Sequence, residues 1–204
     1  MIGKIKKFYS ENPEEYDAER NTENVPENFL RQRERFISMV SGERILDAGC
    51  GTGKDTDYFV DRGMDAIGVD ISHGMISYAR EHKKGRFQVM DIRNLGFQDG
   101  SFHGVWCCAS IFFMPKEGVM NALDEMNRIL KPNGVIYVSF KIGDGNTTRK
   151  RNGQKIKEYL FREKDIKEML ENASFKIVES DTNKGGKTGE TFGTYTCEKT
   201  GNLS

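Results

Sequence analysis

The feature that most constrains the fold is a glycine-rich loop that directly follows a short apolar run. Residues 45–56 read ILDAGCGTGKDT, with Gly49, Gly51 and Gly53 in the loop and Asp47 two positions before it. Glycine allows positive φ and a close approach of backbone N–H groups to a ligand, and a helix predicted from Asp55 adds its dipole. A purely structural turn needs fewer glycines. The pattern therefore predicts a ligand-binding loop between a strand and a helix.

Short apolar runs alternate with helical patterns from position 44 onward. The predicted strands are 44–48, 65–70, 86–90, 103–109 and 134–140. Between them, helices are predicted at 55–62, ending at Gly63, after a Ser72 cap, and along an apolar stripe over 119–130. This alternation is typical of a parallel sheet wrapped by helices, so we expect one α/β domain with a Rossmann-like, doubly wound sheet.

The two ends of the chain are expected to complete this domain. The stretch KIGDGNTTRKRNGQK lacks an apolar period, so residues 143–157 are predicted to form a loop or lid. A last helix over 166–173 precedes two strand-like runs, 175–182 and 191–199, that suit a hairpin with an antiparallel edge strand. We expect a helical cap segment over 1–43, with a helix entered at Pro26, a domain over 44–199 and a tail over 200–204.

The charge balance and the hydropathy of the chain limit the binding partners and the cellular location that we expect. Lysine plus arginine balance aspartate plus glutamate at 31 each, so no overall field attracts nucleic acid or an acidic membrane. We expect no DNA partner and no RNA partner; the cationic segment 149–157 is the one feature that favours RNA. No apolar run reaches the roughly 18 residues of a spanning helix, and the basic start lacks the apolar region of a signal peptide. The expected location is cytoplasmic.

Cysteine and histidine spacing gives no sign of a metal site. Cys50, Cys107, Cys108 and Cys197 contain no CxxC pair, and the three histidines are scattered. Adjacent cysteines cannot readily bridge to each other, and reduced, buried cysteines act as small hydrophobes. We expect free thiols and no metal.

The spacing of the glycines distinguishes two kinds of nucleotide site. The dinucleotide fingerprint G-x-G-x-x-G would need glycine at position 54, where Lys54 stands. The sequence instead has an acid, any residue, then G-x-G-x-G. In this it resembles the class I S-adenosylmethionine-dependent methyltransferases, in the small-molecule branch of that family. The resemblance covers roughly residues 40–180 and implies S-adenosylmethionine as cofactor.

Two further acids support the resemblance. Asp70 ends the second predicted strand, where an acid can accept hydrogen bonds from both ribose hydroxyls. Asp91 follows the third strand, at the family position that takes the adenine amino group, while the backbone N–H of Ile92 meets the ring. The alternatives are that Asp70 only caps the next helix and that Asp91 is a turn residue. The motif LKPNG at 130–134 matches a structural turn of the family.

The resemblance also implies the remaining cofactor contacts and the topology. Asp47, Gly49, Cys50, Gly51 and Gly53 belong to the first motif. Ile71, Met75 and Ala109 are further implied cofactor-binding residues, and Tyr16 is the implied cover, although Tyr9 is equally placed for that role. The implied sheet has seven strands in the order 3-2-1-4-5-7-6, with strand seven antiparallel.

The residues after the fourth strand bear on the methyl acceptor. They read CCASIFFMP, which lacks the tetrad of enzymes that methylate amino groups in DNA, the Pro-Cys of pyrimidine-C5 enzymes and the carboxylates of metal-dependent enzymes. Phe113 stands where many small-molecule relatives place a histidine, so no general base is identified and the catalytic residues stay unknown. Residues 111–114 are expected to line an apolar pocket. The sequence predicts methyl transfer to a small-molecule N, O or S acceptor without metal. The alternatives are an NAD-dependent oxidoreductase and a non-catalytic cofactor-binding or tRNA-associated partner protein.

Overall fold

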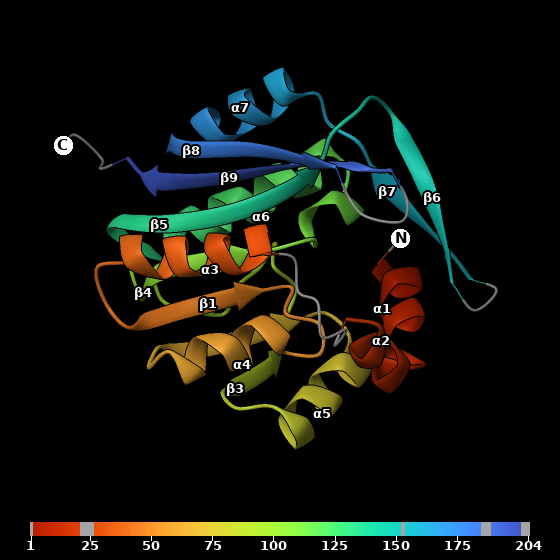
Figure 1. Ribbon diagram of the computed structural model, residues 1–204. Helices are drawn as coiled ribbons and strands as arrows, with labels where there is room; N and C mark the ends of the chain where they lie inside the picture. Colours follow the sequence, from red (N-terminus) through yellow and green to blue (C-terminus); the bar gives the residue numbers. More distant parts are fainter. Residues whose placement is uncertain (1, 21–26, 152–153, 185–188, 201–204) are drawn as a thin grey trace.

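The computed structural model describes residues 2–20, 27–151, 154–184 and 189–200 (Figure 1). The helices are α1 (Ile2–Ser10), α2 (Pro13–Arg20), α3 (Glu27–Met39), α4 (Lys54–Asp61), α5 (His73–His82), the 3₁₀ turn η1 (Ile111–Phe113), α6 (Lys116–Ile129) and α7 (Glu163–Asn172). The strands are β1 (Arg44–Ala48), β2 (Asp65–Asp70), β3 (Arg86–Val89), β4 (Phe102–Cys107), β5 (Leu130–Lys141), β6 (Asn146–Arg151), β7 (Gln154–Tyr159), β8 (Phe175–Lys184) and β9 (Thr191–Lys199). Pro26 and most of the predicted tail, 201–204, lie outside the described residues.

The main sheet has seven strands in the order β3-β2-β1-β4-β5-β9-β8. Strands β1 to β5 pair in parallel, and β9 runs antiparallel to both β5 and β8. Since β8 and β9 take the places of the sixth and seventh strands, the expected order and the antiparallel strand are confirmed. The carboxyl ends of β1, β2 and β4 therefore meet at the point where the strand order reverses, which is where ligands bind in such sheets.

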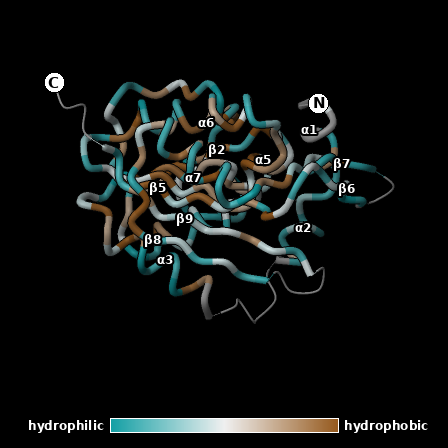
Figure 2. Tube along the Cα trace, turned by 90° about the horizontal axis from the view of Figure 1, so that it is seen from above, coloured by the Kyte–Doolittle hydropathy of each residue, from teal (hydrophilic) through white to brown (hydrophobic). Residues whose placement is uncertain are grey.

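Helices cover both faces of this sheet. Phe36 of α3 and Phe59 of α4 pack with Trp106 and Tyr137 on one face, and α6 and α7 bury their apolar stripes on the other. The hydrophobic residues accordingly follow the central strands, while hydrophilic residues lie at the periphery (Figure 2). The predicted stripe of α6 is confirmed, because Val119, Leu123 and Met126 are fully buried. Among the described residues, no helix is both long enough and apolar enough to cross a membrane.

The start of β5 differs from the expectation. The strand begins at Leu130 rather than after the LKPNG turn. Its pairing with β4 shifts register between Phe102 and Gly104, and Asn133 adopts a left-handed φ of 59°. The LKPNG residues therefore form a bulge at the start of β5. The extra residues loop out of the β5 side of the pairing, and the hydrogen-bonded pairing with β4 continues beyond them.

The prediction that residues 143–157 form an irregular loop is wrong. Strands β6 and β7 pair antiparallel, with Arg149 opposite Ile156, and form a separate two-stranded sheet. The hairpin reaches from the end of β5 toward α1 (Figure 1). An apolar period is missing because only Ile156 and Glu158 of β7 are buried, and one of those two is charged. Residues 152–153 lie outside the described residues.

The N-terminal helices lie against α5. Ser10 Oγ is 2.8 Å from Ser72 Oγ, and Asp17 Oδ2 accepts from Tyr78 at 3.3 Å and from Lys83 at 3.2 Å. Gly74 permits this approach, because a Cβ there would stand 2.5 Å from the carbonyl oxygen of Ser10. Helices α1 and α2 are thus fixed beside the carboxyl end of β2.

Candidate functional site

The glycine loop turns sharply at the carboxyl end of β1. The N–H groups of Gly49 and Cys50 both donate to the carbonyl of Val69, at 2.8 and 2.9 Å, which ties the loop to β2. Gly49 has φ of 83°, and a Cβ there would stand 2.4 Å from the Cβ of Ser110. Gly51 has φ of 55° and lies under the ring of Tyr16. Both positions therefore need glycine, one for space and both for conformation.

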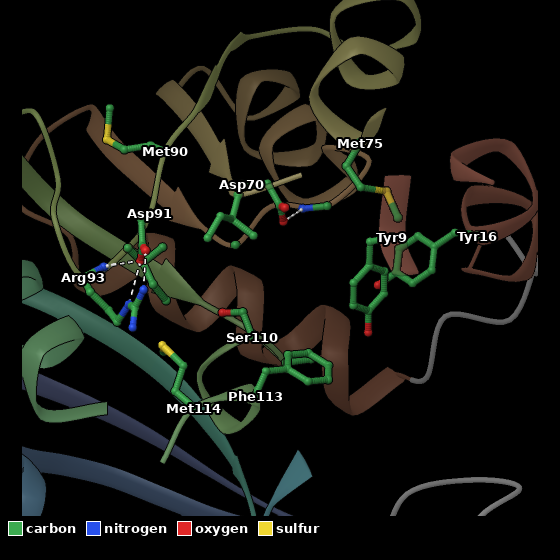
Figure 3. A pocket seen from close by; sticks show the side chains of 15 residues that line it. Tyr9, Tyr16, Asp70, Met75, Met90, Asp91, Arg93, Ser110, Phe113 and Met114 are labelled. Carbon is green, nitrogen blue, oxygen red and sulfur yellow. Dashed lines mark hydrogen bonds and ion pairs between the residues drawn. The ribbon is translucent and has the colours of Figure 1, made fainter. Parts of the chain in front are cut away.

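A pocket opens above this loop (Figure 3). Its void, including the open mouth, is about 710 Å³. The lining residues are Tyr9, Tyr16, Gly49, Gly51, Asp70, Ile71, Met75, Met90, Asp91, Ile92, Arg93, Ala109, Ser110, Phe113 and Met114. Nine of the twelve residues that the family resemblance implies as cofactor-binding are among them.

Asp70 joins the glycine loop to helix α5. Its Oδ2 accepts from the Gly51 N–H at 3.0 Å, and its Oδ1 accepts from the Ser72 N–H at 2.8 Å. Burial raises the pKa of Asp70, while these backbone hydrogen bonds act in the opposite direction. The cap of α5 itself is Ser72, whose Oγ accepts from the Met75 N–H, as expected. Asp70 is therefore more than the helix cap of the alternative interpretation: its carboxylate also organises the loop and lines the pocket.

Asp91 lies on the side of the pocket away from Tyr9 and Tyr16 (Figure 3) and is paired with Arg93. Arg93 Nε donates to Asp91 Oδ1 at 3.0 Å and Nη2 to Oδ2 at 2.6 Å, and the Arg93 backbone N–H donates to Oδ1 (Figure 3). The hydrogen bonds that it donates to the Asp91 carboxylate raise the pKa of the Arg93 guanidinium. This end of the pocket thus combines an acid and a fixed cation. The sequence did not predict a role for Arg93, because a single arginine in a turn belongs to no motif with a fixed spacing.

The turn after β4 is held by neighbouring strands. Ala109 has a φ of 55°, which is rare for a residue with a Cβ. Its N–H donates to Ser139 Oγ of β5 at 2.7 Å, and Ser110 Oγ donates to the Ala48 carbonyl of β1 at 3.0 Å. The strained turn is therefore clamped between β1 and β5. Strained backbone of this kind is concentrated at functional sites.

Aromatic side chains form another part of the pocket wall. Tyr9 stands edge-on to both Tyr16 and Phe113, with ring centroids 5.5 and 5.7 Å apart. Burial raises the pKa of the Tyr9 hydroxyl above its usual range. Tyr9 is therefore a neutral phenol at physiological pH. Both candidate tyrosines line the pocket, and of the expected 111–114 wall Phe113 and Met114 do so, while Ile111 and Phe112 are buried in the core.

Three expected site residues lie behind the loop instead of in the pocket. Asp47 is buried and accepts from Thr56 Oγ1 at 2.7 Å. Burial, reinforced by the nearby Asp55 carboxylate, raises the pKa of Asp47 well above its usual range. Gly53 is the N-cap position of α4 and packs against Phe87. Cys50 borders a smaller cavity that shares Tyr16, Gly49, Gly51 and Ala109 with the main pocket. These residues shape the loop from beneath.

A buried polar network supports the loop from the same side. Arg33 of α3 forms an ion pair with Asp55, and Trp106 Nε1 donates to the other Asp55 oxygen at 2.9 Å. Arg33 also lies over the rings of Phe29 and Tyr58. Helix α3 is thereby linked to the first turn of α4, directly after the glycine loop.

No histidine lines the pocket. His73 and His82 lie on α5, and His103 packs at the other end of the sheet against Gly42 and Lys131. Within the described ranges, no three His, Cys, Asp or Glu side chains gather in a way that could hold a metal ion. The titratable side chains that line the pocket are Tyr9, Tyr16, Asp70, Asp91 and Arg93.

Comparison with known proteins gives this geometry a family context. Residues 45–134 match the family model of a methyltransferase domain. The malonyl-[acyl-carrier protein] O-methyltransferase of Pectobacterium atrosepticum is 36% identical over 117 residues, which is 55% of this chain and 45% of that protein. The O-methyltransferase rstn1 of Aspergillus nomiae is 28% identical over 193 residues, 88% of this chain and 83% of that protein.

A solved structure extends the likeness to the whole fold. The 1,6-didemethyltoxoflavin-N1-methyltransferase of Burkholderia thailandensis, solved with 1,6-didemethyltoxoflavin and S-adenosylhomocysteine, has a TM-score of 0.76 at 20% identity, covering 98% of this chain and 88% of that one. At this identity the likeness concerns the fold. The matches to the first two curated relatives cover 45% and 47% of their length, so the chain spans about half of each.

Proposed function

We propose that the protein transfers a methyl group from S-adenosylmethionine to a small-molecule N, O or S acceptor, since residues 45–134 match the family model of a methyltransferase domain. One observation carries the proposal above all: Asp70, Asp91 and the glycine loop, which are separated in sequence, line one pocket. The NAD-dependent alternative has no such support, since Lys54 replaces the third glycine of its fingerprint.

The residues of the pocket fit the cofactor. Asp70 lies where the resemblance assigns an acid to the ribose hydroxyls, and Asp91 and Ile92 line the end that it assigns to adenine. Gly49 and Gly51 keep the loop free of side chains beside the pocket. Asp47, Cys50 and Gly53 are proposed to support the loop, whereas Ile71, Met75, Ala109 and Tyr16 are proposed to contact the cofactor.

The aromatic wall is proposed to receive the acceptor. When bound, S-adenosylmethionine supplies an electrophilic methyl group on a positively charged sulfur. Tyr9, Tyr16 and Phe113 offer π faces and apolar surface, which favour a cation and exclude water. Placing acceptor and methyl group together can supply on the order of 7 to 11 kcal/mol at best. Positioning and desolvation by these side chains are therefore the proposed source of the rate acceleration.

Calorimetry tests the proposed cofactor directly. S-adenosylmethionine and its demethylated product are expected to bind with micromolar affinity, roughly −8 kcal/mol, because the pocket combines two acids with a side-chain-free loop. NAD titrated under the same conditions serves as the control and should give no heat of binding. Tight NAD binding without binding of the sulfonium compound would reverse the assignment.

The pH dependence tests whether the protein supplies a base. Because burial raises the pKa of Tyr9 and no histidine lines the pocket, the acceptor is expected to arrive already nucleophilic. Turnover should then rise with pH along the acceptor's own ionisation and level off above it. Two acceptors of different pKa should give two different midpoints, and Tyr9→Phe should stay within about tenfold of the parent rate.

Two results would contradict this mechanism. One is an inflection that stays at the same pH when the acceptor changes. The other is a loss of roughly a hundredfold or more in Tyr9→Phe, which is what removal of a positioned base produces.

A further inference from the structure

We propose that the outward face of the hairpin β6–β7 binds single-stranded nucleic acid. The face is defined by the exposed side chains of Lys150, Lys155 and Lys157 and the half-buried ring of Tyr159, together with their cross-strand neighbours Thr148 and Asn146. The proposal goes beyond methyl transfer and does not depend on it.

The first observation is the segregation of charge. The whole chain has equal numbers of cationic and acidic residues, yet residues 146–159 contain five cations and a single acid, Glu158. That acid is buried and paired inward with Lys141 and Arg149. The outward face therefore carries positive charge alone, although the average charge of the chain predicts no nucleic-acid partner.

The second observation is the register of the two strands. Lys150 lies directly opposite Lys155, and Thr148 lies opposite Lys157. All four residues are exposed. Like charges directly opposite each other destabilise a strand pair, and none of the three lysines forms an ion pair with an acid in the part of the chain that the structure describes. The repulsion between Lys150 and Lys155 destabilises the hairpin when nothing is bound. A bound anion that lies across both lysines would remove this repulsion.

The inner side of the hairpin holds this face in a fixed position. Ile156 is 2% exposed and Glu158 is 1% exposed. Glu158 bridges Lys141 at the end of β5 and Arg149 of β6. Strand β7 also packs against η1 and α1, so the lysines are presented by an anchored strand pair.

The composition of the face favours nucleic acid over an acidic protein. Alternate residues of β7 bring Lys155, Lys157 and Tyr159 into a row with a spacing of about 7 Å. Lys157 Nζ lies 4.9 Å from the centroid of the Tyr159 ring, so cation and aromatic ring form one patch. Single-strand binding surfaces combine cations that follow the phosphates with aromatic rings on which bases stack. Hydroxyl and amide side chains such as Thr148 and Asn146 are further phosphate-binding groups.

Fluorescence anisotropy with a labelled single-stranded oligouridine tests the proposal. Binding is expected in the micromolar range at roughly 50 mM salt, weakening with a log–log salt slope of about −2 for three phosphate contacts. The variant Lys150→Gln/Lys155→Gln/Lys157→Gln should bind at least tenfold more weakly. The control Lys164→Gln/Lys167→Gln/Lys176→Gln removes the same charge from exposed positions on α7 and β8, and it should bind like the parent.

A second pair of measurements separates nucleic acid from an acidic protein. Tyr159→Ala is expected to weaken oligouridine binding by roughly fivefold or more, since it removes one base-stacking platform. Polyglutamate of the same charge should bind weakly and be insensitive to that change. Equal loss in the two triple variants, or polyglutamate binding as tight as that of oligouridine, would overturn the proposal. Methyl transfer to small acceptors should be unchanged in the hairpin triple variant, so failure here and failure of the enzymatic proposal are distinguishable.

Discussion

Asp70→Ala is expected to weaken S-adenosylmethionine binding at least tenfold while the protein stays folded. The substitution removes a charged acceptor that is proposed to hold the ribose hydroxyls, and each such hydrogen bond contributes about 1.5 to 3 kcal/mol before compensation. It also removes the partners of the Gly51 and Ser72 N–H groups. Calorimetry gives the affinity, and thermal unfolding gives the stability of the same sample.

Ser72→Ala is the matched control for this experiment. It removes the Oγ that caps α5 at the Met75 N–H and contacts Ser10 Oγ of α1, and it leaves the Asp70 carboxylate in place. A lost cap costs about 1 kcal/mol of stability, so this variant should melt earlier and still bind the cofactor. If Asp70→Ala behaves in the same way, with unchanged affinity per folded molecule, then Asp70 is a structural residue only.

Lys141→Met is expected to lower the free energy of unfolding by about 3 to 5 kcal/mol. Lys141 and Glu158 are each 1% exposed and form an ion pair, and Glu190 lies 2.5 Å from the same Nζ. Removing the cation leaves Glu158 buried with less compensation, which is the reason for the large effect. Urea unfolding followed by the fluorescence of Trp106, the single tryptophan, measures the change.

Two variants show whether this loss comes from the buried pair. Lys157→Met removes an exposed cation from the same strand and should change stability by no more than about 0.5 kcal/mol. The double variant Lys141→Met/Glu158→Leu removes both buried charges, so it should recover much of the loss. An unchanged urea midpoint in Lys141→Met would mean that the pair does not stabilise the hairpin.

Local sequence patterns predict both the fold and the presence of the acids and the glycine loop in one pocket. Alternating strands and helices predict a parallel sheet, and the carboxyl ends of parallel strands meet at one edge. Gly49, Gly51, Asp70 and Asp91 each stand at such an end, so their convergence on one pocket could be predicted without coordinates. Ser72 as the cap of α5 is equally local, since a cap involves residues three positions apart.

The roles of the other residues depend on contacts between distant segments, which leave no periodic signal. Sequence spacing treated Tyr9 and Tyr16 as alternatives, whereas the docking of α1 and α2 on α5 brings both to the pocket. It grouped Asp47 with the pocket residues, whereas the Thr56 hydroxyl holds its side chain beneath the loop. Residues 143–157 read as a loop, and the adjoining Glu158 could not be recognised as an inward-facing residue, because its buried partner lies 17 positions away at Lys141. Local propensity fixes the elements here, but only the packed structure decides which charges and rings face one another.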